Sequence, residues 1–400
     1  MNLPNDTFCV VPWISLEATP TGTVRPCCLA EHELRDDLGH AYRLTETSFE
    51  ALRDCSDLIA LRKQFLEGQR PKTCAKCWAE EAAGRVSKRM HTLTRLQHII
   101  PADSWTTDAK PLQFLDLKLG NICNLKCRIC GSWSSSTAAV EELKFSKDKK
   151  DSYHYSMLKL GAWPRAAGSF WQQLGNDLTD LRYIEFTGGE PFLIEEHFAL
   201  LKQLIDQDLA TRIELHYNTN GTVYPEEYVN LWSQFKLVEI AVSVDDVGDR
   251  FEYQRANAKW EQIVENIERF KTLKQWLPSL RLQFCITVNI FNVYDLEHIA
   301  VWTAAQGFDY VYWNMLHERR EFSIGSLPVS VKQIVQDRLE SSLVDTATRQ
   351  QFDDIVRFMQ NGTSLPIANL LNLIELTDLR RGENLKTVAP RWAEILYAAA

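Results

Sequence analysis

The sequence lacks long apolar runs, an excess of basic residues and any internal repeat. No uninterrupted apolar stretch approaches the ~20 residues that a membrane-spanning helix needs. The first six residues, Met-Asn-Leu-Pro-Asn-Asp, lack the basic region and apolar core of a signal peptide. The net charge of -9 argues against a global electrostatic grip on nucleic acid, although it leaves room for a local basic groove. We therefore expect a cytoplasmic protein with no membrane partner.

The composition is that of a globular protein with an unusual supply of cysteine. Hydrophobic residues make up 45% and charged residues 24% of 400 residues, which excludes a disordered chain, a coiled coil and a collagen-like repeat. In a reducing compartment, clustered cysteines predict metal ligands or catalytic thiols rather than disulfides. The ten cysteines are Cys9, Cys27, Cys28, Cys55, Cys74, Cys77, Cys123, Cys127, Cys130 and Cys285.

Beyond residue 112, short apolar runs alternate with helical patterns. This rhythm predicts a parallel sheet with helices outside it. The helical patterns cover His197–Leu209, Trp260–Leu277 and Asp295–Ala305, and a polar insertion is expected near residues 145–165. The six predicted strands are Phe114–Leu119, Tyr183–Phe186, Ile213–Tyr217, Val238–Val244, Leu282–Val288 and Tyr310–Trp313.

The flanking parts of the chain read differently. Residues 1–90 are rich in cysteine and turn residues, with a predicted hairpin from Trp13–Leu16 to Thr23–Arg25 and a helix over Ser56–Glu67. The polar stretch Pro101–Pro111 reads as a link to the next unit. We expect three parts: a cysteine-rich domain over 1–100, an α/β unit over 101–328 and a helical extension over 329–400.

The strongest chemical signal is a loop with three cysteines. Cys123, Cys127 and Cys130 directly follow the first predicted strand, at the edge of an α/β sheet where ligands bind. Three thiolates can hold three irons of one iron–sulfur cube and leave the fourth iron open, whereas a structural zinc site normally has four protein ligands. The alternatives are three unrelated core cysteines, or a zinc knuckle with a distant fourth ligand.

This Cys-x3-Cys-x2-Cys loop resembles the signature of the radical SAM superfamily, over roughly residues 112–320. The resemblance implies an incomplete six-stranded β/α barrel of the TIM type. It also implies a [4Fe–4S] cluster whose open iron binds S-adenosylmethionine (AdoMet), and reductive cleavage of AdoMet to a 5′-deoxyadenosyl radical. Ile129 stands where the family often has an aromatic residue, and we expect it to pack beside the adenine.

Motifs at the ends of the later strands extend the resemblance. Glycines allow close backbone approach to a ligand, and a carboxylate accepts hydrogen bonds from an ammonium group. Gly188, Gly189 and Glu190 resemble the family's GGE motif for the methionyl amino group. Further contacts to AdoMet are expected from residues at the ends of the third to sixth strands: Asn218, Asn220, Ser243, Asp245, Arg255, Asn289 and Asn314.

The roles of two groups of residues after these strands stay undecided. The family usually has glycine after the aspartate, whereas Asp246 stands here and competes with Asp245 for the ribose. His317, Glu318, Arg319 and Arg320 follow the sixth strand, where they could bind substrate, transfer protons or form a solvated turn.

The N-terminal cysteines suggest a second cluster. Cys9, Cys27, Cys74 and Cys77 resemble the twitch domain, a shortened relative of the SPASM domain that carries an auxiliary [4Fe–4S] cluster. Cys27 and Cys28 compete for one ligand position, and spacing favours Cys27. The order is unusual, because this module commonly follows the core. Cys55 and Cys285 read as packing residues, with a reactive thiol as the alternative for Cys285.

The resemblance implies an oxidoreductase or related radical enzyme. AdoMet, an electron donor such as flavodoxin or ferredoxin, and a carbohydrate-type small molecule or a peptide are the expected partners. The auxiliary cluster would accept an electron from the substrate radical. Two alternatives are an epimerase that uses a thiol such as Cys285 as hydrogen donor, and a zinc-stabilised adaptor protein without enzymatic activity.

Overall fold

A single eight-stranded sheet forms the centre of the protein. The computed structural model describes residues 3–98, 100, 105–166, 171, 178–317 and 319–400. The sheet has the order β2-β1-β3-β4-β5-β6-β7-β8. All neighbours from β1 through β3 to β8 are parallel. The core strands are β3 (Phe114–Lys118), β4 (Tyr183–Thr187), β5 (Glu214–Thr219), β6 (Leu237–Ser243), β7 (Leu280–Val288) and β8 (Tyr310–Met315).

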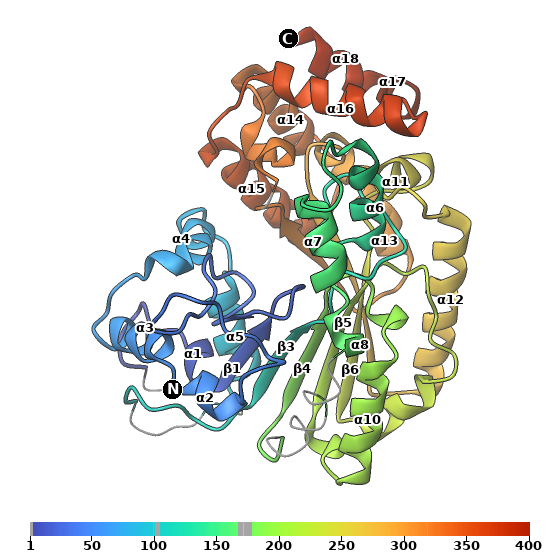
Figure 1. The fold of residues 1–400 in the computed structure, drawn as a ribbon. Helices are drawn as coiled ribbons and strands as arrows, with labels where there is room; N and C mark the ends of the chain where they lie inside the picture. The colour runs from blue at the N-terminus through green and yellow to red at the C-terminus, as the bar shows by residue number, and fades with distance from the viewer. Residues whose placement is uncertain (1–2, 99, 101–104, 167–170, 172–177, 318) are drawn as a thin grey trace.

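These six parallel strands are the six that the apolar runs predict, so the expected α/β barrel-type core is confirmed. Helices connect the strands, and α10 and α12 run along the outer side of the sheet (Figure 1). The insertion between β3 and β4 is also confirmed, because Lys147, Lys149 and Lys150 lie exposed between two helices. The helices of this region are α6 (Ser136–Phe145), α7 (Tyr153–Leu160), α8 (Trp163–Ala166), α10 (Glu196–Asp206), α11 (Asp249–Gln254), α12 (Trp260–Trp276) and α13 (Leu296–Ala305).

The N-terminal region continues the same sheet. β1 (Ser15–Ala18) pairs in parallel with β3, and β2 (Val24–Arg25) pairs antiparallel with β1. The predicted hairpin is therefore present, but its first strand begins at Ser15 because a short helix with Pro12 in its first turn precedes it. The helices of this region are α1 (Val11–Ile14), α2 (Phe49–Arg53), α3 (Ser56–Leu66), α4 (Ala75–Ala82) and α5 (Lys88–Arg95).

The C-terminal region is helical, as predicted, and packs beyond one end of the sheet (Figure 1). The indole of Trp392 donates a 2.7 Å hydrogen bond to the carbonyl of Ile290 after β7, which ties the last helix to the barrel. No helix within the described ranges is long and apolar enough to cross a membrane. The helices are α14 (Val329–Glu340), α15 (Thr346–Asn361), α16 (Ile367–Arg381), α17 (Leu385–Val388) and α18 (Pro390–Ala398).

Short 3-10 turns complete the described structure. They lie at Lys72–Cys74, Pro191–Leu193, Ala210–Arg212, Val229–Gln234, Val293–Asp295, Arg320–Phe322 and Ile324–Ser326. The predicted linker Pro101–Pro111 lies partly outside the described residues, which resume at Trp105.

Candidate functional site

A cavity of about 520 Å³ lies between the inner face of the sheet and the N-terminal region. This volume is in the range of small-molecule sites. Side chains alternate between the two faces of a strand, so every second residue of a strand reaches the cavity. The residues of β3 to β8 that line it are Phe114, Asp116, Lys118, Tyr183, Glu185, Thr187, His216, Asn218, Thr219, Ser243, Gln283, Cys285, Thr287, Tyr310, Tyr312 and Asn314.

The three-cysteine loop lies at this cavity. Cys123, Cys127 and Cys130 all line it, on the loop that follows β3. A hydrogen bond between the Cys127 and Cys130 thiols lowers the pKa of Cys127 and raises that of Cys130. Burial raises the pKa of Cys123 to about 12. The loop is held in place by backbone hydrogen bonds from Lys126 to Ala256 (3.1 Å) and from Arg128 to Gln254 (2.8 Å).

The donor set of this loop fits an iron–sulfur cube. Within the described part of the chain, no three Cys, His, Asp or Glu side chains converge on one point as the ligands of a single ion do. A cube places each thiolate on a different iron, so its ligands need to face a common space rather than a common point. Cys123, Cys127 and Cys130 face such a space, and soft thiolates are the donors that iron–sulfur clusters take.

The glycine motif packs against the cysteine loop. Gly188 has a φ of +119°, and a side chain on Gly189 would meet the carbonyl oxygen of Ile122 at 2.1 Å. Both glycines line the cavity, so close approach explains why glycine stands at these positions. The amide of Glu190 donates a 2.8 Å hydrogen bond to the same carbonyl of Ile122. The turn after β4 thus supports the loop.

Glu190 does not line the cavity, unlike its neighbours Gly188 and Gly189. It accepts hydrogen bonds from the Asn220 amide (2.7 Å), the Thr219 hydroxyl (2.8 Å) and the Phe192 amide (3.1 Å). Burial raises the pKa of Glu190 to about 7, even though these donors favour the charged form. In this arrangement Glu190 fixes the end of β5, and its contact with the methionyl group stays a prediction.

The two asparagines at the end of β5 lie at the same cavity as the cysteine loop. Asn218 and Asn220 both line the cavity. The Asn220 side-chain amide lies 3.7 Å from the Cys123 sulfur and donates a 3.0 Å hydrogen bond to Asn124 Oδ1. Asn220 therefore positions the cysteine loop from the neighbouring strand.

Most of the remaining expected AdoMet contacts, at the ends of β6 to β8, line the cavity, and one does not. Ser243, Asp245, Arg255 and Asn314 line the cavity. Asn289 is fully buried and lies outside the cavity lining, where its side chain bonds to the backbone of Thr287 and Phe291. The Asn289 amide holds the loop after β7.

Asp246 also lies outside the cavity lining, and which of the two aspartates contacts the ribose stays a prediction. Its carboxylate accepts hydrogen bonds from Arg250 (3.0 Å) and Gln254 (2.9 Å). Burial raises the pKa of Asp246 to about 7. Asp245 faces the cavity instead, and its Oδ2 lies 2.8 Å from the guanidinium of Arg255.

The Asp245–Arg255 pair is a buried salt bridge whose loss has a measurable cost. We expect Asp245→Asn to lower the free energy of unfolding by about 3 kcal/mol, because it leaves a buried guanidinium without its counter-charge. Urea unfolding of the anaerobically prepared chain measures this. The exposed Asp151→Asn is the matched control, with a change within about 0.5 kcal/mol. A cost at Asp245 as small as that of the control would contradict the role of this pair.

The N-terminal cysteines separate into a group of four and one neighbour. The negative charges of Cys74, Cys27 and Cys77 add to burial in raising the pKa of Cys9, and Cys77 likewise helps to raise that of Cys27 to about 11. Cys28 instead lines the cavity, where its charged neighbours are Lys88, Asp116 and Lys118. Cys9, Cys27, Cys74 and Cys77 thus interact with one another, and Cys28, which also interacts with Cys27, lines the cavity.

The two remaining cysteines differ. Cys55 is buried in the core, as predicted. Cys285 faces the cavity from β7, and burial raises the pKa of its thiol to about 12. The alternative of a reactive thiol at Cys285 therefore stays open.

Residues of the turn after β8 line two different cavities. His317 lines the inner cavity, and its Nε2 lies 2.6 Å from Glu80 Oε1 on α4. Burial alone would raise the pKa of Glu80, but hydrogen bonds from His317 and Arg85 outweigh it and lower the pKa. This contact joins the N-terminal region to the barrel. Arg319 lines the outer cavity described next, and Glu318 lies outside the described residues.

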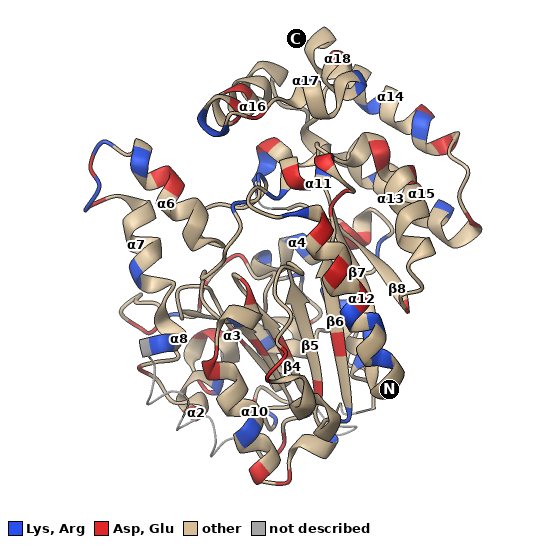
Figure 2. Ribbon diagram, turned by 90° about the vertical axis from the view of Figure 1, so that its right-hand side faces the viewer, with Lys and Arg blue, Asp and Glu red and all other residues tan. Residues whose placement is uncertain are grey.

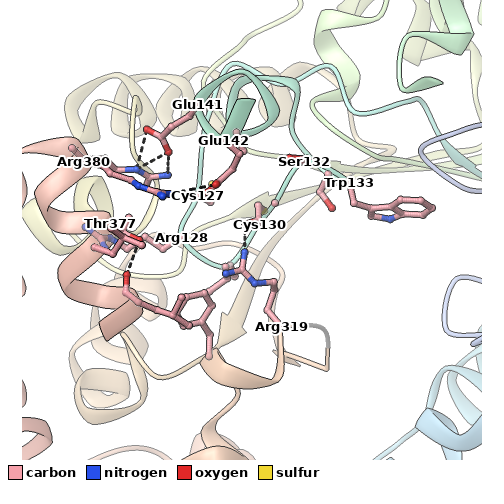
Figure 3. A pocket seen from close by; sticks show the side chains of 18 of the residues that line it. Cys127, Arg128, Cys130, Ser132, Trp133, Glu141, Glu142, Arg319, Thr377 and Arg380 are labelled. Atoms are coloured by element: carbon pink, nitrogen blue, oxygen red, sulfur yellow. Dashed lines mark hydrogen bonds and ion pairs between the residues drawn. The ribbon is translucent and has the colours of Figure 1, made fainter. Parts of the chain in front are cut away.

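A second cavity of about 550 Å³ lies on the outer side of the cysteine loop. Cys127, Ile129 and Cys130 line both cavities. Figure 3 shows Arg319 reaching the loop, where it donates a 2.8 Å hydrogen bond to the Cys130 carbonyl. The C-terminal helix α16 closes the far side with Thr377 and Arg380. The sequence shows no signal for this cavity, because it depends on packing between segments about 250 residues apart.

Comparison with known families decides the identity of this site. The family profile of the radical SAM superfamily matches residues 117–276, which include the cysteine loop and the ends of β4 to β6. Residues 117–276 thus belong to the radical SAM superfamily. The profile of SPASM, an iron–sulfur cluster-binding domain, matches residues 9–78. The expected cofactors, a [4Fe–4S] cluster bound with AdoMet and a further iron–sulfur cluster, are thereby confirmed, and the chain is a radical SAM enzyme.

The chain is similar to several solved structures, among them the following two. The first is native anSMEcpe with bound AdoMet, at 16% identity and a TM-score of 0.37, covering 57% of this chain and 60% of that chain. The second is Streptococcus suis SuiB bound to precursor peptide SuiA, at 13% identity and a TM-score of 0.33, covering 82% of this chain and 67% of that chain. The chain thus spans about 60% of the length of anSMEcpe. No curated protein matches it.

Proposed function

We propose that this chain is a radical SAM oxidoreductase that dehydrogenates a carbohydrate-type or peptide substrate. When bound, the cofactors supply a 5′-deoxyadenosyl radical for hydrogen abstraction from a substrate C–H bond and an auxiliary cluster for the substrate's second electron. One observation carries the proposal: the three-cysteine loop, the predicted AdoMet contacts other than Glu190 and Asn289, and Cys28, next to the N-terminal cysteine group, border one cavity.

Each part of the chain has a distinct task in this proposal. Residues 101–328 form the core, in which Cys123, Cys127 and Cys130 hold the catalytic cluster. Residues 1–100 hold the auxiliary cluster through Cys9, Cys27, Cys74 and Cys77, and residues 329–400 cover the outer side of the cysteine loop. The AdoMet contacts come from the ends of the strands: Gly188, Gly189, Glu190, Asn218, Asn220, Ser243, Asp245, Arg255, Asn289 and Asn314.

The position of Cys27 supports electron transfer out of the cavity. Cys27 is adjacent in sequence to Cys28, which lines the cavity, so this member of the N-terminal group lies close to the cavity wall. A substrate radical formed in the cavity would therefore have an acceptor nearby. Quantifying the products of one turnover tests this. A dehydrogenation gives one two-electron-oxidised product per 5′-deoxyadenosine and consumes no external reductant overall, because the substrate radical returns the electron that cleaved AdoMet.

The outer cavity suits delivery of the first electron. Cys127 and Cys130 line it as well as the inner cavity, where the substrate would bind. Arg380 lies at its rim, 3.4 Å from Glu142. We propose that a donor such as flavodoxin or ferredoxin docks there.

The docking site is tested by comparing two reductants. We expect Arg380→Glu to slow AdoMet cleavage driven by flavodoxin at least about tenfold while cleavage driven by the small reductant dithionite is unchanged, because only the protein donor has to bind this rim. An equal rate with both reductants would place the docking site elsewhere.

A second candidate function, epimerisation, is favoured by two thiols in the cavity wall. Cys28 and Cys285 both line the cavity, and a thiol that returns a hydrogen atom to the substrate radical would have to do so. The oxidoreductase proposal expects Cys28→Ala and Cys285→Ala to retain at least about half of the turnover of any compound that raises 5′-deoxyadenosine formation. Accumulation of 5′-deoxyadenosine without product in either variant, together with deuterium uptake from D2O by the wild type, would favour the epimerase instead.

A further inference from the structure

Charged side chains occupy the inner face of the barrel, where closed barrels usually have packed apolar layers. Asp116 and Lys118 on β3 and Glu185 on β4 line the cavity, and Lys88 and Arg95 reach it from α5. Figure 2 shows charged positions on the strands as well as on the outer helices. A wall of this kind is suited to a polar ligand.

Most of these charges are already paired. Lys88 lies 2.7 Å from Glu185, and Arg95 lies 2.9 Å from Glu239. Arg25 and Lys118 both contact the buried Glu17. These contacts give each of the four cations and three of the carboxylates a partner of opposite charge. These side chains therefore need no ligand to be satisfied.

Asp116 is the exception. Its residue is 2% exposed, it lines the cavity, and its Oδ1 has no hydrogen-bond partner among the described residues. Burial and the negative charge of Glu185 raise the pKa of Asp116 to about 6. A buried carboxylate oxygen without a partner is costly, and such groups in folded proteins call for an explanation.

A second unpartnered oxygen lies on the next strand. The hydroxyl oxygen of Thr187 is buried without a hydrogen-bond partner, and Thr187 also lines the cavity. In the parallel pairing of β3 and β4, Asp116 stands opposite Glu185 and Lys118 opposite Thr187. Asp116 and Thr187 are therefore neighbours on one face of the sheet, two residues apart along the strand direction.

We propose that Asp116 and Thr187 bind hydroxyl groups of a small polyhydroxylated substrate, a carbohydrate or cyclitol. The carboxylate accepts a hydrogen bond from one hydroxyl, and the threonine exchanges one with a neighbouring hydroxyl. This inference rests on the proposed function and selects between its two substrate classes.

The charge of the wall favours a neutral donor group over an ammonium group. The lining holds four acidic side chains, Glu80, Asp116, Glu185 and Asp245, against five basic ones, Arg25, Lys88, Arg95, Lys118 and Arg255. A cationic group on the ligand would add a charge that this set does not offset, whereas a hydroxyl adds none.

The test measures binding and turnover separately. The reconstituted enzyme is given myo-inositol, D-glucose or a serine-containing decapeptide, and binding is followed by saturation-transfer NMR while 5′-deoxyadenosine is quantified. We expect a polyol to bind and to raise 5′-deoxyadenosine formation at least about tenfold over the level without substrate. Asp116→Asn should weaken polyol binding at least about tenfold, whereas the exposed Asp151→Asn should not.

A thermal scan distinguishes ligand binding from a structural role. Asp116→Asn should unfold at the same temperature as the wild type or higher, because it removes a buried carboxylate with an unsatisfied oxygen. A lower unfolding temperature, polyol binding unaffected by the substitution, or binding of the decapeptide alone would overturn the inference. Absence of 5′-deoxyadenosine under every condition would overturn the proposed function, and the NMR measurement would still decide the role of Asp116.

Discussion

Cys127→Ala is expected to abolish reductive cleavage of AdoMet, lowering 5′-deoxyadenosine formation by more than about 1000-fold, because a cube held by only two thiolates is not retained. Cys127 is the central cysteine of the loop and lines the cavity together with Cys123 and Cys130. Its thiol already contacts that of Cys130. Removing this thiol leaves one iron of the cluster without its protein ligand.

Iron analysis gives the same prediction a second readout. The anaerobically reconstituted wild type should hold about eight irons per chain, and Cys127→Ala about four. Cys55→Ala is the matched control, since Cys55 is also buried but lies in the hydrophobic core. It should keep the full iron content and the activity. A Cys127→Ala chain that still forms 5′-deoxyadenosine would refute the assignment of the catalytic cluster.

Cys27→Ala is expected to lose the auxiliary cluster while keeping AdoMet cleavage. Cys27 interacts with the other three cysteines of the N-terminal group, whereas its neighbour Cys28 faces Lys88 and Lys118 in the cavity. Iron content should fall to about four per chain in Cys27→Ala and stay at about eight in Cys28→Ala.

These adjacent substitutions form a controlled pair. Both remove one thiol from the same turn, so a general loss of structure would affect them alike. 5′-Deoxyadenosine formation without substrate should persist in Cys27→Ala, since the catalytic loop is untouched, while substrate oxidation should fall at least about 100-fold. If Cys28→Ala lost iron and Cys27→Ala did not, the ligand assignment would be reversed.

The sequence predicts the sheet well because β3 to β7 are mostly buried and their apolar residues stand out from the polar loops around them. The ends of β3 to β8 differ from the predicted ones by no more than two residues. Motifs at strand ends are then brought together by the parallel topology alone. This is why Cys123, Gly188, Asn218, Asp245 and Asn314 meet at one cavity.

Side-chain direction beyond the strand ends could not be predicted. Glu190 and Asn289 stand in the expected turns, but local backbone donors and acceptors take up their polar groups. Neighbouring residues such as Asp245 and Asp246, or Cys27 and Cys28, point to different surroundings because the chain turns between them. Their order in the sequence carries no sign of which one faces the cavity.

Contacts between distant segments were also beyond the sequence. The N-terminal region joins the barrel as an additional parallel strand, with Ser15 beside Phe114. The C-terminal helices cover the outer side of the cysteine loop, where Arg128 contacts Asp378 at 2.5 Å. Both arrangements depend on packing over more than 90 residues of intervening chain, which no local pattern encodes.

The most direct test of the central claim is anaerobic incubation of the reconstituted chain with AdoMet and dithionite. The account predicts that AdoMet perturbs the electron paramagnetic resonance spectrum of the reduced cluster and that 5′-deoxyadenosine and methionine form in equal amounts. A chain with a full complement of iron and sulfide that leaves AdoMet intact and its spectrum unchanged would contradict it.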